Sequence, residues 1–159
     1  MNPGSARPAV TVQKATRAPG LPGAAQLRRW AGAALVADSA SGPLVQPAQV
    51  TLRFVGEREG RRLNRQFRGK DYATNVLTFV YQRRPLWGDV VLCQPVIRRE
   101  AETQGAGLQA HQAHLVVHGL LHLQGYDHEN RRDAEVMERR EAEILGALGY
   151  SDPYRVYRG

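Results

Sequence analysis

The chain has 159 residues, which suffices for one compact domain and is too short for two ordinary ones. Apolar residues make up 42% of it, which excludes wholesale disorder, and no run approaches the roughly 18 apolar residues of a membrane span. The net charge of +7 favours a polyanionic partner, and the lone cysteine and the lack of an apolar leader predict a cytoplasmic protein.

The first part of the chain predicts two strands and two helices. We expect a flexible tail at residues 1–8, a short strand at 9–13, a helix at 24–37 and a linker at 39–47. Residues 49–55 (QVTLRFV) alternate apolar and polar side chains, as a strand with one buried face does. Residues 57–68 predict a basic helix, with Leu63 and Phe67 four residues apart on its buried side.

The second part predicts two more strands and three more helices. The strands are 75–81 and 89–93, separated by a break at 85–88, and the helices are one that starts at Pro95, 110–124 and 131–148. Gly125 stands where the 110–124 helix is expected to end in a left-handed residue. We therefore expect a single α/β (α+β) domain over residues 1–159, with a small mixed sheet of about four strands packed with about five helices.

All five histidines lie between positions 111 and 128. His118 and His122 are four residues apart, so both side chains project from one face of the predicted helix. His128 follows beyond Gly125, where the chain can turn back toward them. The pattern H-x-x-x-H-x-x-G-x-x-H offers three neutral nitrogen ligands and leaves a fourth position open, which is typical of a catalytic zinc site. We therefore predict one Zn²⁺ per chain, at the end of this helix.

The other two histidines, His111 and His114, precede this pattern and lack a third partner. We interpret them first as packing residues. Two further roles stay open: support for a ligand histidine, for which His114 is the candidate, and contact with RNA.

The histidine spacing equals that of the metzincin proteases, H-E-x-x-H-x-x-G-x-x-H. In those enzymes a glutamate directly follows the first histidine and activates the attacking water, whereas here that position is Gly119. A metal site without this carboxylate can still serve phosphodiester cleavage, provided that cations stabilise the developing charge.

Such cations are concentrated in residues 53–70, which carry seven basic residues against Glu57 and Glu59, a local charge of +5. Residues 96–150 carry six basic residues against nine acids. This uneven distribution favours a phosphate-binding groove over residues 53–70 beside the metal site, and a solvated helix face is the alternative.

Residues 118–128, HGLLHLQGYDH, closely resemble the H-G-x-L-H-L-x-G-Y-D-H signature of the YbeY family, bacterial zinc-dependent endoribonucleases of ribosomal RNA maturation. Residues 63–79, LNRQFRGKDYATNVLTF, resemble a second block of that family, and 88–92 (GDVVL) and 148–150 (LGY) agree with two shorter ones. The resemblance covers roughly residues 48–153.

This resemblance implies that His118, His122 and His128 bind zinc and that Arg68 is the family's functional arginine. A guanidinium can hold two phosphate oxygens at once and stays charged, so the predicted catalytic residues are Arg68 and His118. The predicted RNA-binding residues are Arg61, Arg62, Arg65 and Arg68. Asp127 could hydrogen-bond a ligand histidine or stabilise the turn.

The implied activity is single-strand-specific RNA cleavage in 3′-end maturation of small-subunit ribosomal RNA and in ribosome quality control. The implied partners are ribosomal RNA and the small ribosomal subunit. Two alternatives stay open: a non-catalytic, zinc-stabilised, RNA-binding ribosome-assembly factor, and a metzincin-like metalloprotease.

Overall fold

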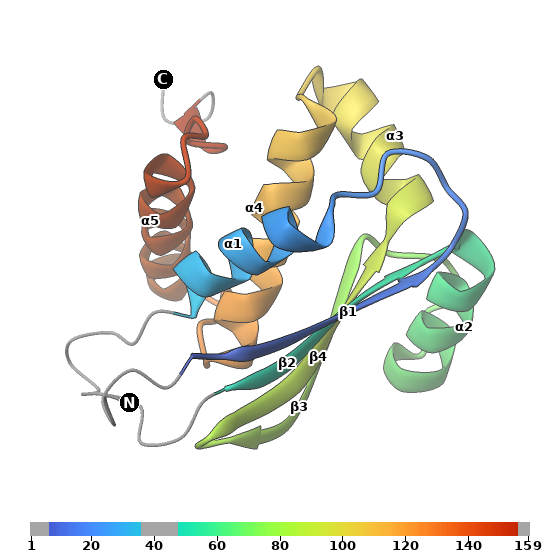
Figure 1. Ribbon diagram of the computed structural model, residues 1–159, viewed down its shortest axis with the longest axis horizontal. Coiled ribbons are helices and arrows are strands. Elements are labelled where there is room, and N and C mark those ends of the chain that lie inside the picture. Colours follow the sequence, from blue (N-terminus) through green and yellow to red (C-terminus); the bar gives the residue numbers. More distant parts are fainter. Residues whose placement is uncertain (1–6, 36–47, 156–159) are drawn as a thin grey trace.

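The computed structural model describes residues 7–35 and 48–155, in which a four-stranded sheet packs with five helices (Figure 1). The elements in chain order are β1 (Ala9–Ala15), α1 (Ala24–Ala34), β2 (Gln49–Val55), α2 (Glu57–Arg68), β3 (Val76–Arg83), β4 (Leu86–Cys93), α3 (Gln94–Gln104), α4 (Leu108–Leu123) and α5 (Arg131–Ala147). The expected α/β class is confirmed. The predicted linker at 39–47, most of the predicted tail and the last two residues of the predicted helix 24–37 lie outside the described residues.

The sheet is mixed, with strand order β1-β2-β4-β3. β1, β2 and β4 are parallel, and β3 runs antiparallel to β4 at the edge of the sheet. The predicted break at 85–88 is wrong, because Arg83 already pairs with Leu86 across a two-residue turn at Arg84 and Pro85. β4 therefore starts three residues earlier than expected, and β3 continues to Arg83.

The larger core lies on one face of the sheet, beneath α1, α4 and α5. β2 contributes Leu52 and Phe54 to it, and α1 contributes Trp30, which is fully buried and meets the Tyr150 ring edge-on at 6.2 Å. α4 contacts both β3 and β4 and packs between α1 and α5, so it is held from several sides. No helix in the described ranges is long and apolar enough to cross a membrane.

The opposite face of the sheet is covered in part by α2, which Figure 1 shows apart from the other helices. Leu63 is half-buried there, but Phe67 is 50% exposed, so the predicted buried side of this helix is only partly right. The helix approaches the sheet closely at Gly60, where a Cβ would stand 3.0 Å from Cys93 Sγ. The helix therefore packs through Gly60 and the buried Asn64, whose side chain donates to the Tyr72 carbonyl (2.7 Å).

Candidate functional site

The structure brings three of the predicted site histidines together at the C-terminal end of α4. The nearest ligand nitrogens of His118, His122 and His128 all lie within 4.8 Å of one another. Three nitrogens bound tetrahedrally to one Zn²⁺ lie about 3.4 Å apart, so the cluster fits this ion with small side-chain movements. His118 and His122 are partly buried and His128 is exposed, which leaves one side of the cluster open to solvent.

A sharp turn returns His128 toward the helix. Gly125 adopts φ +103°, a conformation that L side chains rarely adopt, and its N–H donates to the His122 carbonyl (3.0 Å). The Asp127 carboxylate accepts from the backbone N–H of His128 (2.7 Å). This hydrogen bond supports the turn-stabilising role of Asp127, which is one of the two roles expected from the sequence.

The sequence did not single out Glu141, the residue from α5 that supports this cluster. Its side chain is fully buried, and one carboxylate oxygen accepts a hydrogen bond from Nδ1 of His118. The other oxygen accepts from the Tyr154 hydroxyl and lies 3.2 Å from His114 Nε2. Because Nδ1 of His118 faces Glu141, its Nε2 is the atom left for a metal.

The charges of these groups agree with such a site. Burial acts to raise the pKa of the Glu141 carboxyl, but hydrogen bonds from His114 and His118 outweigh it and lower the pKa to about 2. The pKa of His122 is lowered by burial and then by the charges of His118 and His128, which favours the neutral, metal-binding form.

A second group, His114, His118 and Glu141, also has its ligand atoms within 4.8 Å of one another and could hold a metal. Its polar atoms already satisfy each other, since His114 Nε2 also lies 3.0 Å from the Tyr154 oxygen. We therefore interpret this group as the support of the three-histidine cluster. His111 is buried and lies 3.0 Å from Glu100, in keeping with the packing role expected for it.

Residue 119, where the metzincin proteases carry their catalytic glutamate, lies inside the core of this protein. A Cβ on Gly119 would stand 2.7 Å from Val90 Cγ1 and 3.4 Å from Val76 Cγ2. Residue 119 therefore faces the sheet, while its neighbour His118 faces Glu141 and the other histidines.

The basic segment, residues 53–70, offers fewer unpaired cations for a phosphate than its composition suggests. Arg53 pairs with Glu59 (2.8 Å) and Arg61 with Asp71 (2.8 Å), so two of its seven cations are matched by acids. The Arg62 and Arg65 side chains are exposed and have no ion pair with any residue in the described ranges.

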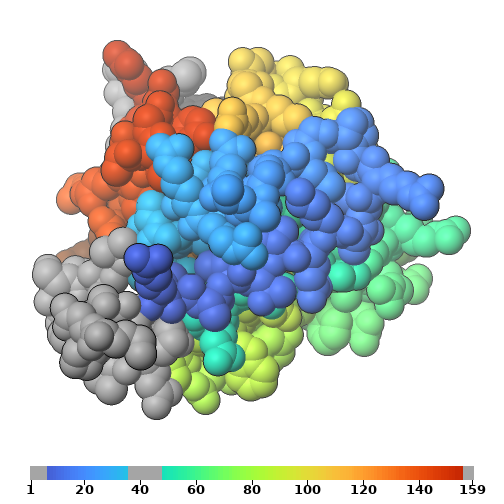
Figure 2. Space-filling view, in the orientation of Figure 1, coloured from blue at the N-terminus to red at the C-terminus, as the bar shows by residue number. Residues whose placement is uncertain are grey.

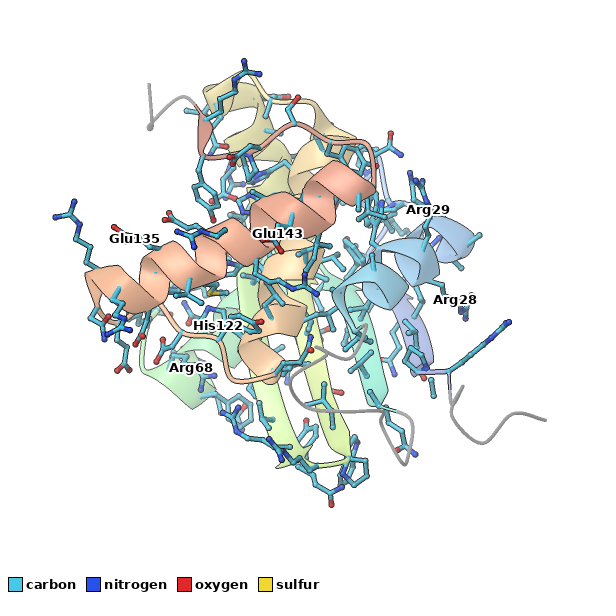
Figure 3. The ribbon with its side chains drawn as sticks, turned by 90° about the vertical axis from the view of Figure 1, so that its left-hand side faces the viewer. Arg28, Arg29, Arg68, His122, Glu135 and Glu143 are labelled. Carbon is cyan, nitrogen blue, oxygen red and sulfur yellow. The ribbon has the colours of Figure 1, made fainter. Side chains whose placement is uncertain are left out.

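α2 and α4 pack on opposite faces of the sheet, so most of the basic segment does not share a face with the histidine cluster, and the expected phosphate-binding groove stays a prediction. Arg68, at the end of α2, reaches the free edge of the sheet, where it donates to the Thr78 carbonyl of β3 (2.8 Å). β3 in turn contacts α4. Figure 3 shows Arg68 and His122 in the same lower part of the molecule.

Fold and site together define an α/β protein with a three-histidine cluster at a helix end. The sequence model of the family described as endoribonuclease YbeY matches residues 18–149. Endoribonuclease YbeY of Aromatoleum aromaticum is 56% identical over 154 residues, 94% of each chain, and that of Nitrosomonas eutropha is 55% identical over 146 residues, 91% of this chain and 97% of the relative.

The solution structure of TM1509 from Thermotoga maritima aligns with a TM-score of 0.57 and 25% identity, over 91% of this chain and 97% of that one. The chain belongs to the YbeY family. The family match starts 30 residues before the motif-bearing region at 48–153, so it includes most of the N-terminal part that carries no motif.

Proposed function

We propose that this protein is a cytoplasmic, metal-dependent endoribonuclease that cleaves single-stranded RNA, and that its substrate is the precursor of small-subunit ribosomal RNA at its 3′ end. The observation that carries this proposal is the convergence of three imidazoles beside one buried carboxylate. The names of the relatives support the reaction class. A role in ribosome quality control and contact with the small ribosomal subunit belong to the same proposal.

His118, His122 and His128 would hold the Zn²⁺, which when bound supplies a Lewis acid for phosphoryl chemistry. Glu141 fixes the His118 ring so that Nε2 faces the cluster, and the rigid α4 fixes its spacing to His122. The exposure of His128 leaves room for an RNA phosphate on the open side.

Arg68 is the proposed stabiliser of charge on the phosphoryl oxygens. It is exposed, and its contacts with the Thr78 and Phe67 carbonyls (2.8 and 3.3 Å) hold the guanidinium at the edge of β3. Arg62 and Arg65 would contact neighbouring phosphates and contribute to affinity. Arg61, paired with Asp71, is expected to contribute less than its charge alone suggests.

The test combines single-turnover cleavage and equilibrium binding on one single-stranded RNA. Arg68→Ala should cleave roughly 10²-fold more slowly with only modestly weaker binding, because an electrostatic stabiliser acts mainly in the transition state. Arg68→Lys should recover only part of the rate. Arg28→Ala removes the same charge on another side of the molecule (Figure 3) and should leave the rate unchanged.

The metal requirement is tested on protein purified without a histidine tag. His122→Ala should abolish cleavage and reduce bound zinc while the protein still binds RNA. Wild-type protein that holds zinc and binds this RNA but never cleaves it would instead favour the non-catalytic assembly factor. Arg68→Ala at the wild-type rate under saturation would remove Arg68 from the reaction.

A further inference from the structure

Two pairs of aromatic side chains line up on the part of the sheet that α2 leaves uncovered. The aromatic strip consists of Phe67 from the end of α2, Phe79 and Tyr81 from β3 and Trp87 from β4. The rings of Phe67 and Phe79 are 5.2 Å apart, and those of Tyr81 and Trp87 are 5.0 Å apart. Tyr81 and Trp87 are 54% and 51% exposed, so most of this apolar surface faces water.

The register of the hairpin shows that the strip lies on one face. Trp87, Asp89 and Val91 alternate along β4 with residues that point into the larger core, and Val91 packs against the α2 side. Phe79 pairs with Asp89, and the Tyr81 hydroxyl donates to the Asp89 carboxylate (2.6 Å). This hydrogen bond raises the pKa of Tyr81 to about 12. A tyrosine is neutral at physiological pH even at its ordinary pKa of about 10, so the ring carries no charge that would repel a phosphate.

Arginines stand at both ends of the strip. At one end Arg68 lies over the Phe79 ring at 5.5 Å, next to the exposed Arg65. At the other end the hairpin turn carries the exposed Arg84, whereas Arg83 pairs with the core residue Leu86 and points to the opposite face of the sheet. Aromatic faces flanked by cations complement the bases and phosphates of a single nucleic-acid strand.

The hairpin that carries Tyr81 and Trp87 also reaches the turn of the histidine cluster, from the opposite face of the sheet. Nη1 of Arg83 lies 3.0 Å from where a Cβ on Gly125 would stand, so the hairpin touches the turn between His122 and His128. β3 is the edge strand that separates the strip from α4, and Arg68 binds its free edge. Figure 2 shows the hairpin (yellow-green) at the lower border of the molecule, beyond α1.

We propose that the aromatic strip is a stacking platform for bases of single-stranded RNA next to the nucleotide that is cleaved. The inference rests on the proposed function, because it names how the same substrate is held. It explains why three large aromatic side chains, those of Phe67, Tyr81 and Trp87, stay about half-exposed near exposed arginines. It also favours unpaired RNA, because the bases of a duplex already stack on one another.

The experiment measures binding of a single-stranded 12-nucleotide RNA by fluorescence anisotropy at fixed salt, together with single-turnover cleavage. Trp87→Ala should weaken binding roughly 5- to 150-fold, the range for the loss of one stacked base, while Trp87→Phe should retain most of the affinity. Val136→Ala removes an apolar side chain of similar exposure (52%) from α5 and should bind as wild type.

Intrinsic fluorescence gives a second readout, because the chain has two tryptophans and Trp30 is fully buried. Single-stranded RNA should quench the wild-type signal, and Trp87→Phe should lose this quenching. Equal quenching by a duplex, or wild-type affinity in Trp87→Ala with cleavage intact, would overturn the platform and leave the endoribonuclease standing. A dimer that Trp87→Ala dissociates would make the strip an interface between copies instead. Wild-type protein that neither binds nor cleaves RNA would overturn both proposals.

Discussion

Gly119 sets how closely α4 approaches the sheet, and Gly119→Ala is therefore expected to destabilise the fold. The added Cβ would stand 2.7 Å from Val90 Cγ1, 3.3 Å from Val90 Cγ2 and 3.4 Å from Val76 Cγ2. Val90 is fully buried and β-branched, so its methyl groups cannot rotate away freely. Overpacking of this kind costs about 1–3 kcal/mol.

Helix propensity acts in the opposite direction, because alanine is favoured over glycine by about 1 kcal/mol in a helix interior. The expected net loss in the free energy of unfolding is therefore between zero and about 2 kcal/mol. For a chain of this size, each kcal/mol lowers the melting temperature by roughly 2–4 °C, so the largest expected decrease is about 8 °C.

The measurement is thermal and urea unfolding of Gly119→Ala beside a matched control. Gly146→Ala lies on α5, where the glycine is exposed and nothing stands within 4 Å of the added Cβ. The control should be stabilised by up to about 1 kcal/mol, so the difference between the two variants isolates the contact with Val90. If Gly119→Ala gained as much stability as the control, the close approach of α4 to the sheet would be refuted.

Two more expectations concern the metal and the RNA. Glu141→Gln should lower the affinity for zinc about 10- to 100-fold, because the amide no longer fixes the His118 ring as a carboxylate does. Chelator competition measures this affinity. Glu143 is exposed, so Glu143→Gln is the control and should bind zinc as wild type. Replacing Arg62 and Arg65 with alanine should make the slope of log K against log salt, measured for single-stranded RNA, less negative by up to about 1.4. An unchanged slope would mean that neither side chain contacts a phosphate.

Local sequence patterns predicted the elements that have both a clear hydrophobic periodicity and clear boundary residues. The alternation of residues 49–55 and the amphipathic run 57–68 became β2 and α2 with the same bounds. The hairpin was misread because Pro85 and Gly88 resemble loop residues, whereas pairing with β3 keeps the chain extended from Leu86 onward. Strand pairing depends on residues of another segment, and a local window does not contain them.

The same limit separates the residues of the site that could be predicted from those that could not. The three histidines share one helix and the turn after it, so their spacing alone brings them together. Glu141 reaches them from α5 through tertiary packing, and its signal is subtle: it occupies a position of the apolar stripe that also holds Met137, Ile144 and Leu145. A carboxylate at such a position calls for a buried partner.

The close packing at Gly119 also bears on the protease alternative. A helix turns about 100° per residue, so the side chain after His118 points toward Val90 and Val76 and away from the histidine cluster. A glutamate placed there would have to bury its carboxylate against these valines or push α4 off the sheet, at a cost of several kcal/mol. Gly119→Glu is therefore expected to unfold at lower urea concentration than Gly119→Ala and to show no peptidase activity. A stable Gly119→Glu variant that cleaves peptides would mean that the helix can rotate to present this position to substrate. The chain shares the spacing of the protease histidines, but it uses the position of the protease base to pack its core.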